Sequence, residues 1–113
     1  ELPCFWLGSG FWCGVSDCPI DTTEFMRAAA GKSHYQYAQE FGNDCKLGEK
    51  TLCCKNEAIY ADPARHCHTF PDSVCPENTT TVFMQRESVW AWSDTMFTGL
   101  CCDPIVFGLK KGE

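Results

Sequence analysis

Ten cysteines in a chain of 113 residues are the feature that most limits how this protein can fold. The count is even, and the cysteine fraction is several times that of ordinary proteins. In a short chain this pattern is typical of secreted domains, because disulfides persist only in an oxidising compartment. We therefore predict a secreted, extracellular protein with a small disulfide-rich all-β fold, or an α+β fold with one short helix.

Other features agree with a secretory route. Asn78-Thr79-Thr80 is an N-glycosylation acceptor, so we expect a glycan on Asn78. The chain begins at Glu1 without a charged and apolar leader, as expected of a mature form whose signal peptide has been removed. No apolar run approaches the roughly 20 residues of a membrane span. The net charge of −6 argues against nucleic acid or an anionic membrane as the partner.

The sequence also contains an internal repeat. Residues 18–27 resemble residues 75–86, and each segment is followed by a leucine and two adjacent cysteines, at 52–54 and at 100–102. A duplicated small unit is expected to pack against its twin, because neither can bury enough surface alone. We interpret the chain as two related units that form one compact domain. Their ranges are 1–57 and 58–113.

The repeat restricts the disulfide pairing. Neither Cys4 nor Cys45 has a counterpart in the second unit. Gaining or losing two cysteines that pair leaves no stray thiol, so we predict a Cys4–Cys45 bond. The remaining bonds are expected within the units, joining Cys13 and Cys18 to Cys53 and Cys54, and Cys67 and Cys75 to Cys101 and Cys102. Two pairings stay open inside each unit.

Short aromatic and β-branched runs predict the strands. In residues 4–13 the sequence Gly8-Ser9-Gly10 separates two aromatic runs, which predicts a hairpin with Trp6 opposite Trp12. Further strands are predicted at 25–27, 52–54, 82–84 and 89–92, and a long loop with one helical turn at 28–41.

Few side chains could carry chemistry. Every cysteine is assigned to a disulfide, and His66-Cys67-His68 places its side chains too close together for a zinc site, so we expect no metal and no cofactor. No catalytic residue is assigned. An alternative is a secreted toxin or small hydrolase that uses His34 with His66 or His68 for acid–base chemistry.

The aromatic residues are better candidates for a binding site. Trp90 and Trp92 would share one face of a strand, and Tyr35 and Tyr37 would share one side of an extended loop. Exposed rings can stack on sugars or anchor a protein partner, although rings in a small domain also serve as core. We expect ligand contact at these four residues, with Trp92 and Tyr37 as the first choices.

The first half of the chain resembles a cysteine-rich module of extracellular proteins. The matching residues run from Cys4-Phe5-Trp6-Leu7-Gly8 to the segment 45–54, with the form C-x-W-x-G followed by C-x-x-G-x-K-x-L-C-C. The module occurs in fungal secreted proteins, including accessory regions of chitinases related to killer-toxin subunits. The resemblance covers about residues 4–54. It implies a secreted, fungal-type setting and an association with cell walls or carbohydrate, without chitinase activity.

Together these features predict a monomeric recognition protein without enzymatic activity. It would bind a glycan or a protein outside the cell, in an effector-like or defence-related role.

The disulfide count can be tested directly. Five disulfides and no free thiol predict that full reduction raises the mass of the intact protein by about ten hydrogen atoms. Mass spectrometry before and after reduction measures this shift. A cysteine that reacts with a thiol reagent before reduction would contradict the prediction.

Overall fold

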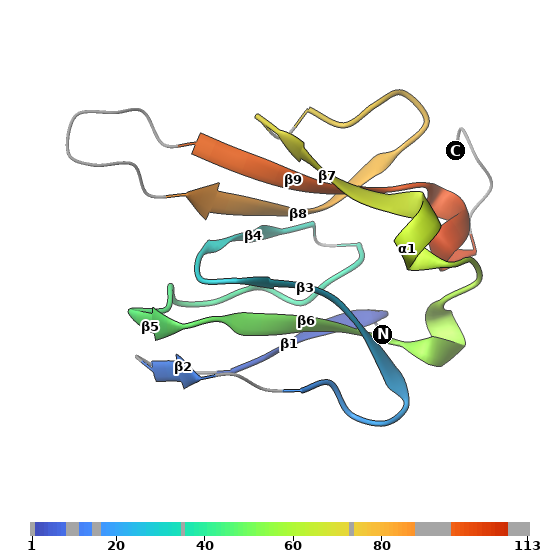
Figure 1. Ribbon diagram of the computed structural model, residues 1–113. Helices are drawn as coiled ribbons and strands as arrows, with labels where there is room; N and C mark the ends of the chain where they lie inside the picture. The colour runs from blue at the N-terminus through green and yellow to red at the C-terminus, as the bar shows by residue number, and fades with distance from the viewer. Residues whose placement is uncertain are drawn as a thin grey trace.

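Figure 1 shows the structure, a computed structural model of residues 1–113. The structure describes residues 2–8, 12–14, 17–34, 36–72, 74–87 and 96–108, and its helices and strands lie within these ranges.

Two antiparallel sheets pack against each other (Figure 1). The first has the order β1-β6-β3, formed by β1 (Cys4–Leu7), β6 (Lys50–Lys55) and β3 (Thr22–Ala28). The second has the order β4-β8-β9-β7, formed by β4 (Gly31–Ser33), β8 (Thr80–Glu87), β9 (Met96–Cys102) and β7 (Cys67–Pro71). A separate parallel ribbon pairs β2 (Trp12–Gly14) with β5 (Leu47–Gly48).

Helical structure is short. It comprises α1 (Pro63–His66) and the 3₁₀ helices η1 (Asn56–Ala58) and η2 (Pro104–Phe107). Helix α1 begins where Asp62 accepts a hydrogen bond from the Ala64 amide at 3.0 Å and proline occupies the first helical position. The predicted class, a small disulfide-rich fold made mostly of strands with one short helix, is confirmed.

All ten cysteines are paired. The bonds are Cys4–Cys54, Cys13–Cys45, Cys18–Cys53, Cys67–Cys102 and Cys75–Cys101. The last three lie within the predicted set. The predicted Cys4–Cys45 bond is wrong, and so is the pairing of Cys13 with Cys53 or Cys54. The reason is strand pairing: β1 lies beside β6, which places Cys4 directly opposite Cys54.

Cys67 corresponds in the structure to Cys4 and not to Cys13. In the structure Cys67 lies opposite Cys102 in the β7–β9 pair, just as Cys4 lies opposite Cys54 in the β1–β6 pair. The strand pairs also share an irregularity, since β3 shifts register against β6 and β8 shifts register against β9 near their starts. Cys13–Cys45 is therefore the bond without a counterpart in the second half.

The division into units 1–57 and 58–113 stays a prediction. Strand β4, which belongs to the first half of the chain, forms the edge of the second sheet. The boundary therefore does not separate the two sheets.

The predicted hairpin over residues 4–13 is wrong. Trp6 lies opposite Leu52 of β6, and Trp12 pairs with Leu47 of β5 instead of with Trp6. The core explains this difference, because the Trp6 indole packs edge-on against the Phe41 ring at 4.8 Å. Its Nε1 also donates a hydrogen bond to Ser33 Oγ at 2.8 Å.

The other predicted strands have mixed outcomes. The strands expected at 25–27, 52–54 and 82–84 lie within β3, β6 and β8, whereas 89–92 lies outside the described residues. The segment 28–41 is not only a loop, because it contains β4. The predicted helical turn corresponds to a single turn closed by the Ala38 amide and the His34 carbonyl at 3.2 Å.

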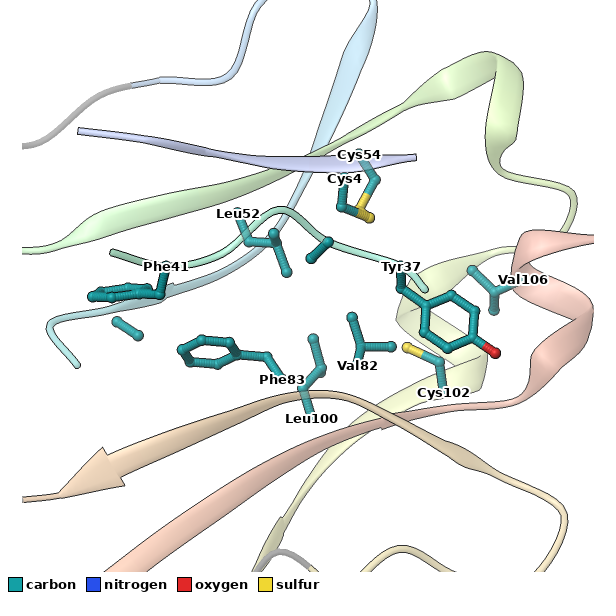
Figure 2. Close-up of a cluster of buried hydrophobic side chains, with 12 residues drawn as sticks. Cys4, Tyr37, Phe41, Leu52, Cys54, Val82, Phe83, Leu100, Cys102 and Val106 are labelled. Carbon is teal, nitrogen blue, oxygen red and sulfur yellow. A yellow bond between two sulfur atoms is a disulfide. The ribbon is translucent and has the colours of Figure 1, made fainter. Parts of the chain in front are cut away.

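The core lies between the two sheets (Figure 2). Leu52 comes from the first sheet, and Val82, Phe83 and Leu100 come from the second. The segment that follows β4 contributes Tyr37, Ala38 and Phe41 to the same cluster. This segment also borders the edge of β1, because the Cys4 amide donates to the Tyr37 carbonyl at 3.0 Å.

Phe83 provides a test of this core. Phe83→Ala should lower the free energy of unfolding by about 3–5 kcal/mol, because the ring is fully buried between the sheets. Ile20→Ala is the control, since Ile20 is 94% exposed and its loss should change stability by less than about 0.5 kcal/mol. Denaturant unfolding with the disulfides intact measures both variants. If Phe83→Ala and Ile20→Ala lowered the free energy of unfolding equally, the assignment of Phe83 to the core would be contradicted.

Candidate functional site

The structure places the predicted binding residues differently from the sequence analysis. Tyr37 is only 6% exposed, and its ring packs against Phe107 with the centroids 4.8 Å apart. Tyr37 is therefore a core residue and not an exposed ligand contact. Tyr35, Trp90 and Trp92 lie outside the described residues.

The β2–β5 ribbon carries an exposed apolar patch that the sequence analysis missed. Trp12 is 66% exposed and Leu47 is 50% exposed, and the two residues are direct partners in the ribbon. We call them the Trp12–Leu47 patch. Cys13, the neighbour of Trp12, is buried and bonded to Cys45 just before β5. The ribbon therefore holds its apolar side chains outward from a covalently fixed base.

Gly48 allows the ribbon to close. A side chain there would place its Cβ 2.6 Å from the Gly14 nitrogen, and the backbone adopts a φ of +77°. Both conditions require glycine. The glycine of the C-x-x-G-x-K-x-L-C-C pattern thus has a structural role in presenting the Trp12–Leu47 patch.

The lysine of the same pattern, Lys50, is also structural. Its side chain is 5% exposed, and Nζ donates hydrogen bonds to the Phe41 carbonyl and, at 3.1 Å, to the Asn43 carbonyl. The ammonium also lies 4.4 Å from the centroid of the Phe41 ring. Burial lowers the pKa of Lys50 below its usual 10.5. Lys50 thereby holds the loop 41–43 in place through two of its backbone carbonyls.

A cavity of about 450 Å³ lies beside α1, between β3 and β7. It is lined by Glu24, Asp62 and His68, among others. Each of these has a structural contact: Glu24 pairs with Arg27 at 3.1 Å, Asp62 caps α1, and His68 Nε2 lies 3.1 Å from the Arg65 carbonyl. The polar groups of this cavity are thus engaged in holding the fold.

A second cavity, of about 570 Å³, lies where β4 and the segment 34–42 meet β8. His34 lines this cavity, whereas His68 lines the one beside α1. His34 and His68 thus line different cavities, and the other pairing of the hydrolase alternative, His34 with His66, stays a prediction.

A third, shallower hollow of about 340 Å³ lies near the start of the chain. Its wall includes Tyr60, whose exposed ring rests on Gly108, where a Cβ would come within 2.8 Å of the ring. Lys55 and Glu57 line the same hollow. An exposed ring beside charged groups offers both a stacking surface and hydrogen-bonding groups.

Within the described ranges, no group of three or more His, Cys, Asp and Glu side chains is arranged to hold a metal ion. In the same part of the chain, no helix has the length and apolar character needed to cross a membrane. The chain matches no protein-family model, no curated protein and no solved structure.

Lys50 generates a prediction with a defined pH dependence. At neutral pH, Lys50→Met should lower the free energy of unfolding by about 1–3 kcal/mol, because the Phe41 carbonyl loses its buried donor. Because folding lowers the pKa of Lys50, the unfolded chain holds more protons between that lowered pKa and 10.5. The stability of the wild type should therefore rise with pH in that window, and its advantage over Lys50→Met should widen.

Denaturant unfolding at several pH values up to 10 tests this. Lys46→Met is the matched control, because Lys46 is an exposed lysine just before β5. A difference between the wild type and Lys50→Met that shrinks as the pH rises would contradict the assigned burial of the ammonium.

Proposed function

We propose that this protein is a secreted recognition domain without enzymatic activity, which anchors on a partner protein outside the cell through the Trp12–Leu47 patch. The observation that carries the proposal is the exposure of Trp12, at 66%, on a ribbon fixed by its own disulfide. A tryptophan side chain buries a large area in an interface and is enriched among the residues that dominate binding energy.

The use of the tryptophans within the chain supports this proposal. Trp6 is partly buried against the core, where it contacts Phe41 and donates a hydrogen bond to Ser33, so this indole serves the fold itself. Trp12 lies on the ribbon instead, next to an exposed leucine. The Cys13–Cys45 bond restricts the ribbon before any partner binds, which reduces the entropy lost on association.

A protein partner is favoured over a sugar at this patch. The neighbour of Trp12 is aliphatic, and an aromatic side chain beside an aliphatic one matches an apolar pocket on a protein surface. A second copy of this chain is disfavoured, because two molecules that each carry a net charge of −6 repel one another.

A glycan is the second candidate ligand, at the Tyr60 hollow. The exposed ring of Tyr60 rests on Gly108, and a sugar would stack on this ring in the hollow that Glu57 also lines. This arrangement supports the association with carbohydrate implied by the resemblance over residues 4–54.

The proposed location follows from the disulfides. Five disulfides in so small a domain fit an extracellular protein. Asn78 lies exposed in a turn before β8, which supports the proposal that it is glycosylated. An effector-like or defence-related role outside the cell is the setting we propose for this recognition.

The patch can be tested by substitution. Trp12→Ala should weaken binding of the protein partner about 30-fold, the effect of losing roughly 2 kcal/mol at a central anchor, without unfolding the domain. The partner is captured from extracellular fluid by the wild type and identified, and its affinity for each variant is then measured. Val74→Ala is the control, because Val74 is an exposed aliphatic residue outside the ribbon and should bind normally.

The same variants separate the two candidate ligands. A glycan array probed with the wild type, Trp12→Ala and Tyr60→Ala shows whether sugar binding depends on Tyr60. If Trp12→Ala binds the partner protein as tightly as the wild type, Trp12 is not the anchor. If a glycan binds the wild type and Trp12→Ala but not Tyr60→Ala, the Tyr60 hollow is the binding site.

A further inference from the structure

The cavity of about 570 Å³ beside β4 is the largest of the three and lies apart from the Trp12–Leu47 patch. We call it the seam cavity, because β4 joins the first half of the chain to the second sheet there. The residues used in the argument are Lys32, His34, Ala38, Glu40, Phe41 and Met84. Its volume is in the range of sites that hold small organic molecules.

The floor of the seam cavity is apolar. Ala38 and Phe41 belong to the hydrophobic core, and half-buried Met84 adds its thioether from β8. Met84 lies directly opposite Lys32 in the β4–β8 pair, so the two side chains share one face of the sheet, opposite to the face on which Phe83 contacts Phe41. A ligand in this cavity would gain affinity by burying an apolar group here.

The rim of the seam cavity carries two opposite charges. Lys32 lies on β4, Glu40 lies on the segment that follows β4, and both are exposed. Neither side chain forms an ion pair with another residue in the described part of the chain. Both charged groups are therefore available to a ligand that enters between them.

The walls of the seam cavity are fixed before any ligand binds. Buried Lys50 holds the carbonyls of Phe41 and Asn43, and the Cys45 amide donates to the Ala29 carbonyl at 2.7 Å. An ion pair between Asp44 and Arg86 ties the same loop to β8. A binding site with fixed walls loses little conformational entropy when it is occupied.

We propose that the seam cavity binds a small zwitterionic molecule with an apolar side chain, such as a hydrophobic dipeptide, with its carboxylate toward Lys32 and its ammonium toward Glu40. The apolar side chain of the ligand would contact Met84, which shares a face of the sheet with Lys32. His34 lines the same cavity and adds an imidazole near the carboxylate end of the ligand. This site is independent of the anchoring function proposed for Trp12.

Nuclear magnetic resonance titration with the dipeptide Leu-Phe tests the proposal. Saturable chemical-shift changes are expected in residues 31–42 and 81–84. Two matched ligands isolate the charges, because the N-acetylated dipeptide lacks the ammonium and the C-amidated dipeptide lacks the carboxylate. Each is expected to bind at least about threefold more weakly than the parent dipeptide, since both ion pairs are exposed to solvent.

Two variants assign the charges to residues. Glu40→Gln should weaken binding of Leu-Phe and leave binding of the N-acetylated dipeptide unchanged, whereas Lys32→Gln should weaken binding of Leu-Phe and spare the C-amidated dipeptide. Both side chains are exposed, so neither variant is expected to unfold. Trp12→Ala is the control and should bind Leu-Phe like the wild type.

The proposal is overturned if Leu-Phe causes no saturable chemical-shift changes, or if these changes map outside the seam cavity. It is also overturned if Leu-Phe binds no more tightly than its N-acetylated and C-amidated forms. If Trp12→Ala binds the partner protein like the wild type while Leu-Phe still binds in the seam cavity, only the anchoring function is overturned.

Discussion

The structure depends on two pairs of adjacent cysteines in central strands. In a strand, neighbouring side chains point to opposite faces, so Cys53-Cys54 in β6 and Cys101-Cys102 in β9 each make one bond toward the core and one away from it. The core-side bonds hold the edge strands β1 and β7, and the outer bonds hold the segments that lead into β3 and β8. Each bond closes a loop of 26 to 50 residues and contributes about 2–4 kcal/mol.

This covalent support explains how so small a domain tolerates a buried cation. Lys50 has lost most of its hydration, and two carbonyls and the face of the Phe41 ring replace only part of it. Burying an apolar residue at this position would cost less desolvation energy. We therefore interpret the role of Lys50 as holding the loop 41–43 through its hydrogen bonds. That loop forms a wall of the seam cavity. The lysine thus links the cysteine framework to the surface that a ligand would meet.

The sequence was sufficient for the fold class because the cysteine count and the short β-branched runs are local signals. The strand pairing was not predictable in the same way. The partner of Cys4 depends on whether the 4–7 segment pairs with its sequence neighbour or with distant β6, and the burial of Trp6 against Phe41 decides this. The location of the binding site was equally hard to predict from sequence. Whether Tyr37 or Trp12 is exposed depends on where each lies relative to the core, and both look alike as aromatic residues in a sequence.

The Cys13–Cys45 bond marks where the two halves of the chain differ in structure. Every other disulfide has a counterpart with the same place in its strand pair, and those bonds hold the sheets. Cys13–Cys45 holds only the β2–β5 ribbon and the end of the loop beside the seam cavity. Cys13 is buried and Cys45 packs against the core, so this bond anchors the ribbon and the end of the loop to the core. The Trp12–Leu47 patch and the seam cavity are therefore both linked to the Cys13–Cys45 bond, which has no counterpart in the second half of the chain.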